Sequence, residues 1–119
     1  MADQPWKSKN WFVSEWNYAD EVRKNFKFAK NIKVHDITLR DGEQQTGIIL
    51  TKDDKIRIAE GLAEAGVHRI EAGMPIVSPS DAEAIKAIVK RNLGPQIFAF
   101  SRCMLEDVKR AIDTGVNGV

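Results

Sequence analysis

The sequence has little cysteine, no long apolar run and almost no net charge. Cys103 is the single cysteine among 119 residues, so an internal disulfide is excluded. No apolar stretch is long enough for a signal peptide or a membrane span, which favours a cytoplasmic protein that does not insert into membranes. Because 18 Lys and Arg residues face 17 Asp and Glu residues, the formal charge is +1, and no strong field recruits nucleic acid or an anionic membrane. The expected partners are therefore small molecules or other proteins.

Residues 1–30 differ in composition from the rest, and we interpret them as an N-terminal arm. They contain all three tryptophans, Trp6, Trp11 and Trp16, and the only tyrosine, Tyr18, but no glycine. The spacing of the tryptophans fits neither the helical nor the strand period. The pattern predicts an irregular arm whose aromatic side chains pack on its own domain or, alternatively, on the second subunit of a homodimer.

From residue 31 onward, strand-like and helix-like segments alternate. Strands are predicted at residues 32–39, 67–73 and 96–100 from their apolar, β-type patterns. Such alternation predicts an α/β fold in which parallel strands are joined by helical crossovers. It leaves open a choice between a barrel and a doubly wound sheet.

Each predicted strand is followed by a segment with apolar residues at helical spacing. Thr51 and Asp54 form the predicted start of the first helix. Ser80 and Glu83 form a predicted capping box for the second. The third is predicted over residues 105–112.

The end of the sequence echoes an earlier part of it. The stretch AEAGVHRIEAG precedes and includes the second strand, and IDTGVNGV repeats its glycine–valine pattern up to Val119. The repeat breaks off where a further strand would enter the sheet, so we expect a truncated fold. A small, complete three-layer domain is the alternative.

Charged residues cluster in the stretch HDITLRDGEQQ, residues 35–45, which begins within the first predicted strand and continues past its end. Continued strand alternation places Ile37 and Leu39 against the helix layer and Arg40 on the opposite, interior face. In the second strand the same alternation turns Glu71 to the interior. Asp41 lies on the following loop, at the edge where parallel α/β folds assemble their sites. The sequence therefore predicts that these three charged groups meet.

These residue types suit chemistry in which a negative charge develops. Arginine offers a permanent charge and several donors for an oxyanion or a carboxylate. Aspartate is a hard oxygen ligand for a divalent cation, and glutamate can orient a substrate or relay a proton. Together they favour carbanion chemistry beside a metal, although a structural ion pair and an ordinary turn at Gly42 explain the spacing equally well.

Two motifs carry a family resemblance. DITLRDGEQ and IEAGMP resemble the paired signature of the DRE-TIM metallolyase superfamily. Leu39, Glu43 and Gln44 make the first motif most similar to that of the 2-isopropylmalate, homocitrate and citramalate synthases. The resemblance implies that residues 31–119 are the incomplete N-terminal portion of a TIM (β/α)8 barrel, with about three strand–helix units.

The resemblance also implies roles for individual residues. Arg40 is implied to be catalytic by stabilising an oxyanion, and Glu71 to be catalytic or substrate-orienting. Gln44 is implied to bind substrate with them, and Asp41 to be a metal ligand. The complete enzymes condense acetyl-CoA with a 2-oxo acid, whose carbonyl a divalent metal, Mg²⁺, Mn²⁺ or Zn²⁺, polarises.

Family members also complete their metal site with a His-x-His pair and an asparagine beyond it. This sequence contains no His-x-His pair. We therefore expect the chain to be the N-terminal part of a metal-dependent acyltransferase of amino-acid biosynthesis that is inactive on its own. The alternatives are a carbon–carbon lyase of the same superfamily, of the hydroxymethylglutaryl-CoA lyase or aldolase type, and a non-catalytic interaction module.

Overall fold

The computed structural model describes residues 4–119. The chain divides after Ile32 into two compact units. Within the described residues, no helix is long and apolar enough to cross a lipid bilayer.

The first unit contains two short helical segments in its described part. A 3₁₀ helix, η1, spans Glu15–Tyr18, and α1 spans Asp20–Arg23. The rings of Trp6 and Tyr18 lie 6.1 Å apart and give this unit an aromatic contact of its own. Trp16 is 65% exposed, so much aromatic surface faces solvent. Docking of the arm on a second subunit stays a prediction.

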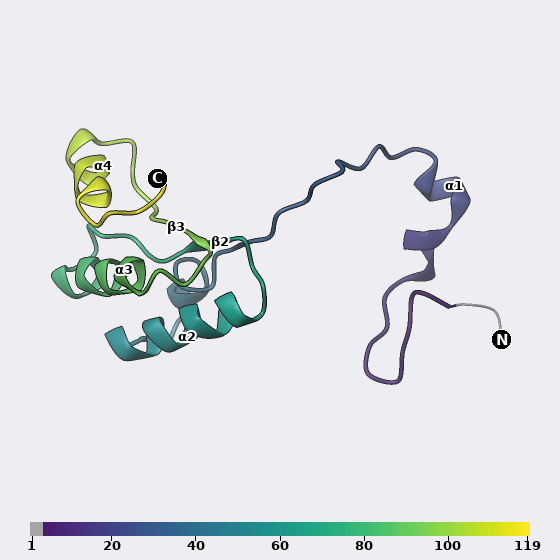
Figure 1. Cartoon of the computed structure of the whole chain (residues 1–119), viewed down its shortest axis with the longest axis horizontal. Helices are drawn as coiled ribbons and strands as arrows, with labels where there is room; N and C mark the ends of the chain where they lie inside the picture. The colour runs from purple at the N-terminus through teal and green to yellow at the C-terminus, as the bar shows by residue number, and fades with distance from the viewer. Residues whose placement is uncertain (1–3) are drawn as a thin grey trace. The chain divides into compact units, whose positions relative to one another are not determined.

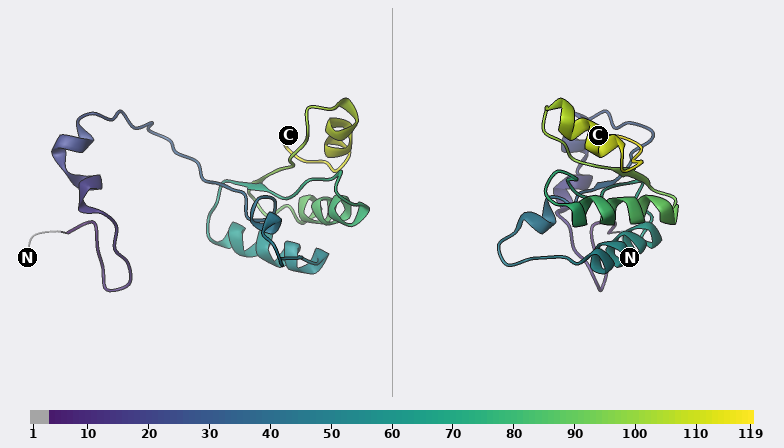
Figure 2. Two further views of the ribbon diagram at one scale, coloured as in Figure 1. Left: turned by 180° about the vertical axis from the view of Figure 1, so that it is seen from behind. Right: turned by 90° about the vertical axis from the view of Figure 1, so that its left-hand side faces the viewer.

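The second unit is built on a parallel sheet with the strand order β1–β2–β3 (Figure 1). The strands are β1 (His35–Asp36), β2 (Arg69–Glu71) and β3 (Gln96–Phe98). Ile70 and Ile97 are partners at the centre of the β2–β3 pair. Phe98 also forms a parallel bridge with Gly118, so the last residues run beside β3 (Figure 2). The predicted α/β architecture with parallel strands is confirmed.

Helices follow the strands, and α2 and α3 pack against each other (Figure 1). The helices of this unit are η2 (Gly42–Gln44), α2 (Lys52–Glu64), α3 (Pro79–Arg91) and α4 (Leu105–Ile112). Thr51 caps α2 as predicted: its hydroxyl accepts the Asp54 N–H at 3.2 Å, and its own N–H donates to the Asp54 carboxylate at 3.1 Å. The Thr51 hydroxyl also donates to the Asp54 carboxylate at 2.6 Å, and this bond, together with that from the Thr51 N–H, lowers the pKa of Asp54. Gly66 ends the helix with φ +82°, where glycine is favoured.

The predicted start of α3 was wrong. The N-cap is Ser78, whose hydroxyl accepts the Asp81 N–H at 3.1 Å, rather than Ser80 with Glu83. The physical reason is Pro79, which fits the first helical position because its φ is already helical and no N–H is needed there. The helix therefore begins earlier in the chain than the Ser80–Glu83 pattern indicated.

The core lies between the sheet and the helices. Its buried members are Leu39, Ile56, Ala59, Ile70, Ala72, Ile85, Ile88 and Ile97. Ile70 and Ala72 are fully buried against the helix layer, as the strand alternation predicted. On α4, in contrast, Leu105 and Ile112 are 70% and 61% exposed, and Ala111 is the apolar residue that is fully buried.

The buried carboxylate of Asp107 gives α4 a pH-dependent anchor. Arg102 donates to it from Nε and, at 3.2 Å, from Nη2. This hydrogen bonding, with the charges of Arg102 and Arg110, holds the pKa of Asp107 below its ordinary value of 3.8 although burial opposes the shift. The ionised form therefore stabilises the fold above pH 3.8, and this contribution is lost as the pH falls through the lowered pKa.

We expect Asp107→Asn to flatten the acid limb of the stability curve. The unfolding free energy of the natural chain should fall as the pH is lowered below about 4, whereas that of the variant should fall less. Urea denaturation followed by circular dichroism at several pH values measures this. Arg102→Met should flatten the same limb, and an unchanged slope in both variants would contradict the assignment.

Candidate active site

Strand β1 ends earlier in the chain than the alternation predicted. The strand ends at Asp36, whose carboxylate accepts the Thr38 N–H at 2.9 Å and the Thr38 hydroxyl at 3.1 Å. The N–H groups of Arg40 and Asp41 then both donate to the Ile37 carbonyl, at 3.1 and 2.8 Å. The chain is therefore in a tight turn here rather than an extended strand.

This turn corrects the predicted directions of its side chains. Ile37 is 40% exposed, so its predicted position against the helices was wrong, whereas Leu39 is fully buried as predicted. Strand parity does not apply to Arg40, because the strand has already ended. The turn nevertheless directs Arg40 toward β2.

Arg40 is held between two carboxylates. Its Nε donates to Glu71 Oε2 at 2.9 Å, and its Nη1 donates to Asp41 Oδ1 at 2.9 Å. The Arg40 and Glu71 side chains are 19% and 13% exposed, whereas Asp41 is 56% exposed. The three charged groups that the sequence singled out therefore meet at one edge of the sheet. The guanidinium has more N–H groups than these two bonds use.

Phe100 completes the surroundings of this guanidinium, and the sequence reading missed it. The Arg40 Cζ atom lies 4.7 Å from the centroid of the Phe100 ring, within the range of a cation–π contact. Because Glu71 is paired with Phe98, continued alternation along the third strand places Phe100 on the same side as Glu71. This alternation is the feature of the sequence that could have predicted the position of Phe100.

A cleft of about 380 Å³ opens beside Arg40. Gln44 at the end of η2 lines it, as do Glu43 and the backbone at Gly73. Ile48, Ile49, Leu50, Met74 and Val77 give the cleft an apolar side. Arg40 and Gln44 thus both line this cleft. Asp41 and Glu71 are not among the lining residues, but both accept hydrogen bonds from the Arg40 guanidinium.

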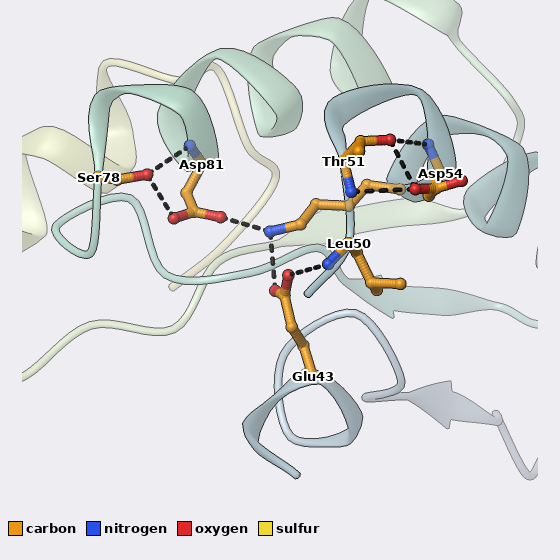
Figure 3. Close-up of polar contacts among 7 residues, drawn as sticks. Glu43, Leu50, Thr51, Asp54, Ser78 and Asp81 are labelled. Atoms are coloured by element: carbon orange, nitrogen blue, oxygen red, sulfur yellow. Dashed lines mark hydrogen bonds and ion pairs between the residues drawn. The ribbon is translucent and has the colours of Figure 1, made fainter. Parts of the chain in front are cut away.

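A charge cluster, Glu43–Lys55–Asp81, joins a buried lysine to two carboxylates that line this cleft, and the sequence reading missed it as well. The Lys55 side chain is only 4% exposed, and its ammonium lies 2.7 Å from Glu43 Oε2 and also contacts Asp81 Oδ1 (Figure 3). Burial lowers the pKa of Lys55, but the bonds to Asp81 and Glu43 outweigh that effect and raise it overall. The sequence did contain a signal for the burial of Lys55, because helical spacing places it on the same apolar face as Ala59 and Leu62.

Sequence comparison identifies the family of this chain. Residues 31–119, which include the Arg40 turn and Glu71, match the HMGL-like family. The chain belongs to the HMGL-like family. The predicted resemblance to the DRE-TIM superfamily is thereby confirmed, and the residues matched are those of the sheet, its helices and the cleft.

Named relatives of this HMGL-like chain are synthases. A probable 2-isopropylmalate synthase of Ignicoccus hospitalis is 47% identical over 90 residues, which are 76% of this chain and 23% of the relative. Homocitrate synthase AksA of Methanothermobacter thermautotrophicus is 40% identical over 109 residues, 92% of this chain and 27% of the relative. A 2-isopropylmalate synthase of Sulfolobus acidocaldarius is 46% identical over 93 residues, which cover 76% of this chain and 24% of the relative. The chain thus spans about a quarter of the length of these relatives.

Proposed function

We propose that this chain supplies the N-terminal part of an acyltransferase that condenses acetyl-CoA with a 2-oxo acid. The observation that carries the proposal is the pair formed by Arg40 and Glu71 beside a cleft, at the carboxyl ends of two parallel strands. In this proposal β1–β3 and their helices are the first units of a TIM (β/α)8 barrel, whose sites lie at that end of the strands. The similarity to synthases of this type supports it.

The side chains of the site would act mainly by electrostatics and orientation. When the deprotonated methyl of acetyl-CoA attacks the keto carbon of the oxo acid, negative charge develops on the keto oxygen. The N–H groups of Arg40 not engaged by Glu71 and Asp41 are suited to donate to that oxygen. Gln44, in the same cleft, is suited to hold a substrate carboxylate or carbonyl. Hydrolysis of the product thioester then releases CoA as a free thiol.

The residues described here do not amount to a metal site. Among residues 4–119, no group of three or more His, Cys, Asp or Glu side chains is placed to hold a metal ion. Asp41 has an exposed carboxylate, but one of its oxygens already accepts from Arg40. Asp41 is therefore proposed as a single oxygen ligand for the divalent cation that the resemblance implies, and no step above depends on that ion.

We expect the 119-residue chain to bind divalent metal weakly. One carboxylate without further ligands does not form the coordination shell that Mg²⁺, Mn²⁺ or Zn²⁺ requires. Isothermal titration calorimetry with Mn²⁺ and Zn²⁺ should give no tight, stoichiometric binding. Tight, stoichiometric binding would contradict this prediction, and its loss in Asp41→Asn would show that Asp41 is one of the ligands.

The proposed function is tested on the full gene product that contains these residues. Acetyl-CoA-dependent release of thiol should occur with one member of a panel of 2-oxo acids and not without an oxo acid. Cleavage of a 3-hydroxyacyl-CoA without an oxo acid would indicate a lyase instead. Absence of both reactions, in a protein that folds and is saturated with divalent metal, would favour the interaction module.

A further inference from the structure

We propose that Lys55 is a positioning residue that fixes the turn carrying Arg40. This role rests on the proposed function, because the position matters for catalysis only if Arg40 acts on the substrate. The residue contributes through Glu43 and Asp81, which lie between it and the cleft.

The cluster joins three segments that are separate in the sequence. Glu43 belongs to η2, directly after the Arg40 turn, Lys55 to the first turns of α2, and Asp81 to the first turn of α3. Figure 3 shows the Glu43 and Asp81 carboxylates turned toward one nitrogen atom, and the ion pairs identify it as the Lys55 ammonium. One buried cation therefore ties the loop after β1 to the helix that follows β2.

Glu43 also connects the two ends of the loop between η2 and α2. While Oε2 binds Lys55, Oε1 accepts the Leu50 N–H at 3.2 Å. The intervening loop contains Gly47 with φ +87°. Asp81 is fixed in its turn by the Ser78 hydroxyl, which donates to Oδ2 at 2.6 Å. Both anions are thus held in place, and Lys55 is the group that joins them.

Removal of the ammonium should disturb the cleft more than the rest of the domain. Glu43 and Asp81 would then face each other as like charges in a site with little solvent, and would separate. Movement of Glu43 carries η2 with it and releases the Leu50 amide. Arg40 precedes η2 by a single residue, Asp41, so its bond to Glu71 is expected to lengthen or break.

A structural test uses the 119-residue chain itself. Lys55→Met should accelerate hydrogen exchange of the Leu50 amide by at least about tenfold and weaken the protected Arg40 Nε–H signal in NMR spectra, with core amides such as Ile70 changed little. Lys55→Arg should restore much of both. Lys52→Met, an exposed lysine in the same helix, is the matched control.

A second variant covers the case in which Lys55→Met does not fold. Glu43→Gln keeps an oxygen for the Leu50 amide but loses the charge opposite Lys55, so it should show the same local change to a smaller degree. Uniform acceleration of all amides, or no change at Leu50 and Arg40 in either variant, would overturn the positioning role.

A kinetic test uses the full gene product. Lys55→Met should lower kcat about 10- to 100-fold, with a much smaller change in KM for the oxo acid, because a displaced Arg40 loses transition-state contacts. Lys55→Arg should recover part of kcat. A rise in KM alone would overturn the role. If the natural protein has no activity, the proposed function fails, whereas the exchange measurement still decides whether Lys55 positions the turn.

Discussion

Replacing Arg40 by alanine in the full gene product is expected to lower kcat by about 10²- to 10³-fold, with a much smaller change in KM for the oxo acid. Removing a donor that stabilises developing negative charge has an effect of this size because the interaction is stronger in the transition state than with bound substrate. The structure supports such a donor: Glu71 and Asp41 fix the guanidinium, and Phe100 covers one face of it.

Two further variants separate the role of Arg40 from simple charge. Arg40→Lys keeps the positive charge but loses the planar fork that reaches Glu71 and Asp41 together, so most of the activity should still be lost. Arg57→Ala, at an exposed position on α2, is the control and should leave kcat unchanged. Steady-state kinetics with saturating acetyl-CoA measures these values. Equal losses in kcat/KM and in oxo-acid affinity, with kcat unchanged, would show that Arg40 only binds substrate.

Replacing Ile85 by alanine is expected to lower the unfolding free energy by about 2–5 kcal/mol. Ile85 is fully buried in α3 and belongs to the cluster that includes Ile70 and Ile56. Its Cδ1 atom also lies 3.4 Å from the position that a Cβ on Gly73 would occupy, so it packs directly beneath the site. A domain of ordinary stability has only about 5–15 kcal/mol in total, so this one change removes a large share.

The matched control is Ile112→Ala, which deletes the same atoms at a position that is 61% exposed. It should cost about 0.5 kcal/mol or less. Urea denaturation should be followed by far-ultraviolet circular dichroism, because all three tryptophans lie in the first unit and their fluorescence reports on that unit. Equal losses for the two isoleucines would mean that α3 does not cover the core as described.

The stability of the domain and the proposed fixing of the Arg40 turn depend on different parts of the same helix layer. Ile85 holds α3 against the sheet, and Asp81 at the start of that helix meets Lys55 behind the cleft. A loss of packing at Ile85 should therefore reduce stability throughout the domain. A loss of charge at Lys55 should act locally, on the turn that bears Arg40.

Local patterns in the sequence were sufficient for the order and type of strands β1–β3 and of α2, α3 and α4, but not for the 3₁₀ helices η1 and η2. Thr51 with Asp54 predicted the start of α2, and the alternation in β2 predicted that Ile70 and Ala72 are buried. These features depend on residues a few positions apart, whose backbone geometry the sequence largely decides. The two family motifs likewise singled out Arg40 and Glu71, which form an ion pair in the structure.

Contacts between distant residues required the tertiary structure. The strand rule turned Arg40 to the interior face by parity, whereas in the structure a hydrogen-bonded turn at Ile37 brings it to Glu71. No local pattern around Lys55 identifies the partners of its ammonium, Glu43 and Asp81, which lie 12 residues before and 26 residues after it. Sequence periodicity determines which face of a helix or strand is apolar, whereas the partner of a buried charge is decided by the packing of the elements, because only packing brings remote groups within bonding distance.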